Sequence, residues 1–100
     1  MKTGTLICYT LGSKPTAVER NRFRKEFWGY RDFSNKGRYT YERDGLISDV
    51  PHVKLIRSVI IVRNEDCDRI VEFLRKNNAT VFMKKVILSK EDQDKLKINE

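Results

Sequence analysis

The chain has few of the residues that build catalytic and metal sites. Its 100 residues include one histidine and two cysteines, and its five glycines are scattered. A structural zinc site takes about four cysteine, histidine or carboxylate ligands. The common phosphate-binding loops are runs rich in glycine. Neither pattern is present, so the sequence predicts no metal site, no cofactor and no nucleotide-binding loop.

His52 is the only histidine, and it stands next to Pro51 and close to Asp49. Catalysis by histidine requires a nucleophile and an orienting acid within hydrogen-bond reach of the ring. A single histidine beside a proline is common in turns. We therefore expect no catalytic residue and a protein that is not an enzyme.

The sequence also lacks the features of a secreted or membrane protein. No apolar stretch approaches the roughly 18–20 residues of a membrane span, and the N-terminal run has no small-residue cleavage site. Cys8 and Cys67 both lie in apolar surroundings. Since nothing suggests an oxidising compartment, we expect two reduced thiols in the core rather than a disulfide. The predicted location is cytoplasmic.

Basic residues, in contrast, are abundant and unevenly spread. The formal net charge is +7. Residues 1–63 contain thirteen Lys/Arg and six Asp/Glu, whereas residues 64–100 contain eight of each. Between Arg20 and Arg43 there are eight basic and three acidic residues. Concentrated positive charge in a chain the size of one domain (1–100) indicates an anionic partner.

The first half of the chain predicts a strand, a helix and a second strand. The apolar run Thr5–Leu11 is typical of a buried strand. Thr16 and Glu19 form a capping-box pattern, which predicts a helix over Ala17–Trp28 that ends at Gly29. The sequence then predicts a loop over Tyr30–Gly37. It predicts a half-exposed strand over Arg38–Arg43, which turns at Asp44-Gly45.

The second half predicts a central strand, a helix and a last strand. Lys54–Arg63 holds four consecutive β-branched residues, as a buried central strand does. Asn64 is expected to cap a second helix that ends at Asn77-Asn78. Thr80–Leu88 is the last strand, and Ser89 is expected to start a short helix to about Leu96.

This βαββαβ order is the split βαβ order of ferredoxin-like domains. We therefore predict an α+β two-layer sandwich, in which one antiparallel sheet carries two helices on one face and a short C-terminal helix follows. The first and third strands would be central, because they are the continuous apolar runs. The second and fourth strands carry charges and would be edges.

The order also resembles that of small ferredoxin-like CRISPR nucleases of the Cas2 type, in which a basic helix follows the first strand. That resemblance implies a metal-dependent nuclease. Thr10 stands near the end of the first strand, where an aspartate would be wanted. The RNA-recognition module shares the order too, but it binds bases through aromatic residues on its central strands. Lys54–Arg63 has no aromatic residue.

The strongest functional signal is the basic helix with the segment that follows it, where arginine and aromatic residues alternate. The planar guanidinium suits phosphate. Phe23 and Phe27 would face the core between two basic flanks, with Arg20, Arg24 and Arg31 sharing one flank. The predicted nucleic-acid-binding residues are Arg20, Arg22, Arg24, Lys25, Arg31, Lys36, Arg38, Tyr39, Tyr41 and Arg43.

We therefore predict a small protein that binds the phosphate backbone of DNA or RNA and forms a homodimer, in which the free face or an edge of the sheet pairs with a copy of itself. One alternative is a protein–protein adaptor or assembly subunit whose arginines meet an acidic partner. A second is a metal-dependent nuclease of the Cas2 type, for which the carboxylates Asp32, Glu42, Asp44 and Asp49 are scattered through predicted loops. A plain solvated helix face is the simplest alternative to any site at all.

Overall fold

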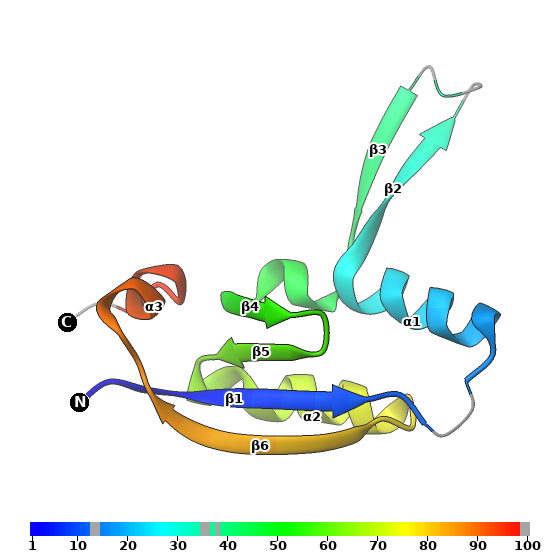
Figure 1. Cartoon of the computed structure of the whole chain (residues 1–100). Coiled ribbons are helices and arrows are strands. Elements are labelled where there is room, and N and C mark those ends of the chain that lie inside the picture. Colours follow the sequence, from blue (N-terminus) through cyan, green and yellow to red (C-terminus); the bar gives the residue numbers. More distant parts are fainter. Residues whose placement is uncertain (13–14, 35–36, 38, 99–100) are drawn as a thin grey trace. The chain divides into compact units, whose positions relative to one another are not determined.

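A computed structural model describes residues 1–12, 15–34, 37 and 39–98 (Figure 1). The chain divides into two units. Met1–Lys14 and Val50–Glu100 form the first, called here the sheet unit. Pro15–Asp49 forms the second, called here the hairpin unit. No helix in the described ranges is long and apolar enough to cross a membrane.

The sheet unit is built on four strands in the order β4-β5-β1-β6. Every neighbouring pair is antiparallel. The bounds are Thr3–Thr10 for β1, His52–Ile56 for β4, Val59–Val62 for β5 and Thr80–Ile87 for β6. The class is therefore α+β with a mainly antiparallel sheet. The two inner strands are β1 and β5, which confirms that the continuous apolar runs lie at the centre.

One face of this sheet is covered by helix α2 (Cys67–Lys76). Residues opposite one another in an antiparallel pair point to the same face, so Ile7 and Ile60 share a face. Both are fully buried, as are Ile70 and Leu74 of α2. Figure 1 shows α2 running along the sheet. Helix α2 therefore packs its apolar side chains on this face of the sheet.

The other face carries a smaller core. Val53 and Ile61 pair across β4 and β5, and they cluster with Leu88 and Leu96. Helix α3 (Lys90–Lys95) begins at Ser89, whose hydroxyl accepts a hydrogen bond from the Asp92 backbone N–H at 3.1 Å. The short terminal helix predicted from Ser89 is therefore present, and Leu96 at its end joins the core.

Two predictions in the sheet unit are wrong. Lys54–Arg63 is not one strand but the hairpin of β4 and β5, which turns at Arg57 and Ser58. The turn has no glycine, proline, asparagine or aspartate, so its only local sign is the polar pair Arg57-Ser58 between two apolar segments. Asn64 does not cap α2. It opens a 3-10 turn, η2 (Asn64–Asp66), and its side chain binds the Thr3 and Thr5 hydroxyls at 3.1 and 2.8 Å.

The hairpin unit begins with helix α1 (Ala17–Trp28), as predicted. The capping box is formed: the Glu19 backbone N–H donates to the Thr16 hydroxyl at 3.0 Å, and the Thr16 N–H donates to the Glu19 carboxylate at 3.1 Å. These bonds lower the pKa of Glu19 below its ordinary value, because they favour the charged carboxylate.

A two-stranded sheet follows α1, and it corrects two more predictions. Its strands are β2 (Gly29–Ser34) and β3 (Tyr39–Asp44). Most of the segment predicted as a loop over Tyr30–Gly37 is therefore a strand, because pairing with β3 satisfies its backbone groups. The predicted second strand pairs with β2 and not with the main sheet, where β4 occupies the edge next to β5. A 3-10 turn, η1 (Leu46–Asp49), closes the unit.

Two glycines hold the base of this hairpin. Gly29 ends α1 with φ of 86°, a conformation that glycine adopts without strain. A side chain on Gly45 would overlap the backbone nitrogen of Gly29 and the carbonyl oxygen of Phe27. The Gly45 N–H also donates to the Ser48 hydroxyl at 3.0 Å. The chain therefore leaves and re-enters the hairpin through two backbone segments in direct contact.

Candidate nucleic-acid interface

Helix α1 separates its aromatic and basic side chains. Phe23 and Phe27 are buried and stack with ring centroids 5.5 Å apart. Arg20, Arg22 and Arg24 are exposed. The helix therefore presents three guanidinium groups to solvent, as the sequence predicted.

The hydrogen bonds of the three α1 arginines go to neutral groups, although the pKa of the Glu19 carboxyl is lowered by its hydrogen bonds with Thr16 and also by the charge of Arg22. Arg20 donates to the carbonyl of Pro15 at 3.2 Å, and Arg24 donates to the side-chain oxygen of Asn21 at 2.8 Å. Among the described residues, none of the three forms an ion pair with a carboxylate. Their charge is thus available to an anionic ligand.

The hairpin of β2 and β3 has two chemically different faces. The register pairs Tyr30 with Arg43, and Asp32 with Tyr41. Opposite residues share a face, and residues two apart on a strand do too. The tyrosine face, as we call it, consists of Tyr30, Asp32, Tyr39, Tyr41 and Arg43. The opposite face carries Arg31, Phe33, Thr40 and Glu42.

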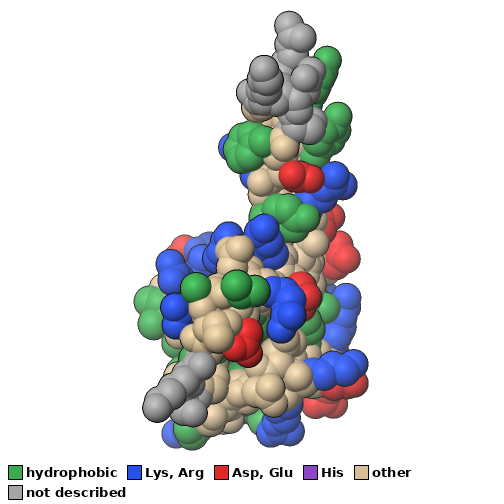
Figure 2. All heavy atoms as spheres, turned by 90° about the vertical axis from the view of Figure 1, so that its right-hand side faces the viewer, with side chains coloured by type: hydrophobic (Ala, Val, Ile, Leu, Met, Phe, Trp, Pro, Cys, Tyr) green, Lys and Arg blue, Asp and Glu red, His purple; other side chains and the backbone are tan. Residues whose placement is uncertain are grey.

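Cations lie against the rings of the tyrosine face. The Arg43 guanidinium is 5.7 Å from the centroid of the Tyr41 ring, and the Lys25 ammonium of α1 is 4.9 Å from that of Tyr30. Both distances are within the range of a cation–π interaction. The rings nevertheless remain open to solvent, with 52% of Tyr39 and 49% of Tyr41 exposed. Figure 2 shows hydrophobic side chains at the surface along the hairpin.

Each face of the hairpin has one acidic residue in an ion pair: Asp32 on the tyrosine face and Glu42 on the opposite face. Arg43 contacts Asp32 at 3.2 Å, and Arg31 contacts Glu42 at 3.5 Å. All four side chains are largely exposed, so each pair adds at most about 1 kcal/mol to stability. Their larger effect is to neutralise the carboxylates of Asp32 and Glu42, which would otherwise repel a phosphate.

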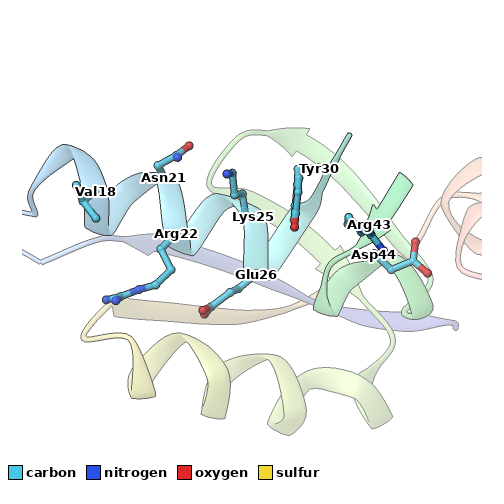
Figure 3. A pocket seen from close by; sticks show the side chains of 8 residues that line it. All are labelled: Val18, Asn21, Arg22, Lys25, Glu26, Tyr30, Arg43 and Asp44. Carbon is cyan, nitrogen blue, oxygen red and sulfur yellow. The ribbon is translucent and has the colours of Figure 1, made fainter. Parts of the chain in front are cut away.

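An open hollow of about 550 Å³ lies in the hairpin unit, between α1 and the base of the hairpin (Figure 3). Arg22, Lys25 and Arg43 line it together with the carboxylates of Glu26 and Asp44. Figure 3 shows Lys25 and Tyr30 side by side. The hollow therefore brings cations of α1 to the tyrosine face, although its mixed charge makes it no dedicated anion pocket.

The predicted site residues fall into three groups. Four lie on α1: Arg20, Arg22 and Arg24 are exposed, and Lys25 is half-buried. Strand β3 carries three more on its tyrosine face: Tyr39, Tyr41 and Arg43. Lys36 and Arg38 lie outside the described residues.

Arg31 corrects the predicted helical flank. It lies on β2, three residues beyond the end of α1, and therefore does not extend the flank of Arg20 and Arg24. Tyr30 is an exposed residue of β2 on the tyrosine face, and it is not among the predicted site residues. Residues 30–33 read Tyr-Arg-Asp-Phe and lack the apolar–polar alternation of a strand, so the sequence has no local signal for this position.

Residues with other chemistry are not gathered into a site. His52 lies on β4, with its Nδ1 at 2.8 Å from the carbonyl oxygen of Val50. The described part of the chain has no cluster of three His, Cys, Asp or Glu residues that could hold a metal ion. Cys8 and Cys67 are free and half-buried. Burial raises the pKa of the Cys67 thiol.

Comparisons of this chain with protein-family models, with curated proteins and with solved structures found no match.

Proposed function

We propose that the protein binds nucleic acid through its hairpin unit, with the exposed arginines of α1 contacting the phosphate backbone. The observation that carries this proposal is the set Arg20, Arg22 and Arg24, which point to solvent without an acidic partner among the described residues. Next to them in the same unit stands a face of exposed tyrosines and cations. Exposed aromatic rings combined with cations are what proteins use on nucleic acid.

The proposed binding is electrostatic and does not read sequence. Each phosphate that the protein neutralises releases counterions. For duplex DNA, each such phosphate lowers the logarithm of the binding constant by about 0.9 for every tenfold rise in salt concentration. Arginine contacts to phosphate position the ligand but carry no base information. The ligand is therefore DNA or RNA of mixed sequence.

A salt titration by fluorescence anisotropy tests the proposal. We expect a variant with Arg20, Arg22 and Arg24 all changed to alanine to bind a labelled duplex more weakly. Its slope should be flatter by about one unit per arginine that contacts phosphate. The matched control changes three exposed basic residues of α2 to alanine: Arg69, Arg75 and Lys76. It removes the same charge and should keep the wild-type slope.

Three results would contradict this function. Equal losses in the two triple variants would mean that only net charge matters. Weak binding of the wild type to all nucleic acids at physiological salt would favour the adaptor alternative. Cleavage of the nucleic acid that depends on added Mg²⁺ would favour the nuclease alternative.

We further propose that the sheet unit is a variant of the ferredoxin-like fold. In that fold the first and third strands are central, and a hairpin joins the second and third. The order β4-β5-β1-β6 agrees with this arrangement if β4 takes the place of the second strand. The hairpin unit would then be an insertion into the connection between β1 and β4, and it would carry the binding residues.

A further inference from the structure

The tyrosine face presents a row of planar groups along one strand. Tyr39, Tyr41 and Arg43 occupy alternate positions of β3 and therefore point to the same side of the hairpin. All three are exposed. Two phenol rings and a guanidinium thus form a row along one side of the hairpin, called here the ladder, in which the guanidinium lies 5.7 Å from the centroid of the Tyr41 ring.

The spacing of this ladder selects among nucleic acids. Alternate residues on a strand are about 6.6–6.8 Å apart. Base pairs in a duplex rise about 3.4 Å and are stacked on one another, so their faces are covered. Unpaired bases can separate and lie against aromatic side chains or arginine planes. The ladder therefore matches separated bases and not a stacked duplex.

The charges next to the ladder suit the backbone of the same strand. Lys25 lies 4.9 Å from the Tyr30 ring at the base of the tyrosine face, and Arg22 lines the same hollow. A strand whose bases lie along β3 would bring its phosphates to these cations. Asp32, the acidic residue of this face, is held by Arg43 at 3.2 Å.

We propose that the tyrosine face is a platform for single-stranded nucleic acid, on which successive unpaired bases stack against Tyr39, Tyr41 and Arg43. This inference rests on the proposed function and specifies its ligand as unpaired DNA or RNA. It assigns base contacts to β3, while the arginines of α1 contact phosphate.

The opposite face of the hairpin provides a matched control. Phe33 is 62% exposed on β2, in the same two-stranded sheet as the tyrosines. Its face carries the Arg31–Glu42 ion pair and no other aromatic residue among those described. Truncating Phe33 therefore removes an exposed ring from the hairpin without touching the ladder.

The test is anisotropy at constant salt with labelled oligo-dT, oligo-rU and a mixed-sequence duplex. We expect Tyr39→Ala and Tyr41→Ala each to weaken single-strand binding by roughly 5- to 150-fold. Duplex binding should change by less than about twofold, because a duplex has no free base faces. Tyr39→Phe and Tyr41→Phe keep the ring and should bind single strands like the wild type. Phe33→Ala should do so too.

The outcomes separate this inference from the proposed function. If the tyrosine variants bind single strands like the wild type while the α1 triple variant loses binding, the platform is wrong and phosphate binding stands. If Phe33→Ala loses as much as the tyrosine variants, the hairpin as a whole and not its tyrosine face is responsible. If the wild type binds none of the probes, both proposals fail. A loss with oligo-dT, oligo-rU or both supports the platform, and the larger loss identifies the sugar.

Discussion

At the scale of single residues, the inner strands give the clearest energetic expectation. Ile61 on β5 is 7% exposed, and it packs with Val53, Leu88 and Leu96. Ile61→Ala should lower the free energy of unfolding by about 2–5 kcal/mol, because it removes buried methyl groups and leaves a cavity. Urea denaturation measures this. Leu55→Ala, at a 51% exposed position of β4, should stay within about 0.5 kcal/mol; similar losses for both would place Ile61 outside the core.

Cys67 offers a second residue-level expectation, in pH dependence. Burial raises the pKa of its thiol above the ordinary value of 9.0. The thiolate is the reactive form, so alkylation should be slow at neutral pH. The alkylation rate of Cys67 should therefore rise at a higher pH than the alkylation rate of a free thiol does. Intact-mass measurements over a pH series test this, with urea-unfolded protein as the reference. An inflection at or below the unfolded value would contradict the raised pKa.

At the scale of elements, the sequence predicts the helix ends that are fixed by hydrogen bonds between neighbouring residues. The Thr16 and Glu19 pattern placed the start of α1, and Gly29 placed its end. Ser89 placed the start of α3. In each case a side chain or a glycine acts on backbone groups within a few residues, so the sequence alone contains the whole interaction.

Elements that depend on distant partners were harder to predict. The turn between β4 and β5 is marked in the sequence only by the polar pair Arg57-Ser58, and the apolar residues on both sides favour a single strand. The segment of β2 is predicted as a loop, because its own residues do not show that it pairs with β3. The same distinction applies to the candidate site. The sequence correctly predicts that Arg20, Arg22 and Arg24 lie on α1. The face that Tyr39, Tyr41 and Arg43 share follows only from the register of β2 and β3.

At the scale of the whole molecule, the edge strand β6 bears on how copies could associate. Lys84 and Lys85 stand in the middle of this strand and are exposed. Charged residues on an edge strand discourage pairing with the same edge of another copy, since like charges would face each other. Association of two copies is thus better sought on a face of the sheet than on this edge.

We expect a homodimer that forms through an apolar row across the sheet. Phe82, Cys8, Val59 and Ile56 follow one another in register over the four strands. Phe82 is 63% and Ile56 62% exposed. Phe82→Asp should therefore shift the protein from dimer to monomer in sedimentation equilibrium, because burying a charge in an apolar contact is costly. Ile87→Asp, on the other face of β6, should leave the dimer intact. A monomeric wild type would contradict the expectation.

The contact between Gly29 and Gly45 has a consequence for variation among related chains. Because the backbone enters and leaves the hairpin at one point, residues can be added to or removed from its tip in pairs without moving either end. The register of β2 and β3 would be kept, and so would the alternation that puts every second side chain on the same face. Lengthening β2 and β3 by two residues each would add one more position to the row of Tyr39, Tyr41 and Arg43. The length of this row can thus change while the base of the hairpin at Gly29 and Gly45 stays the same.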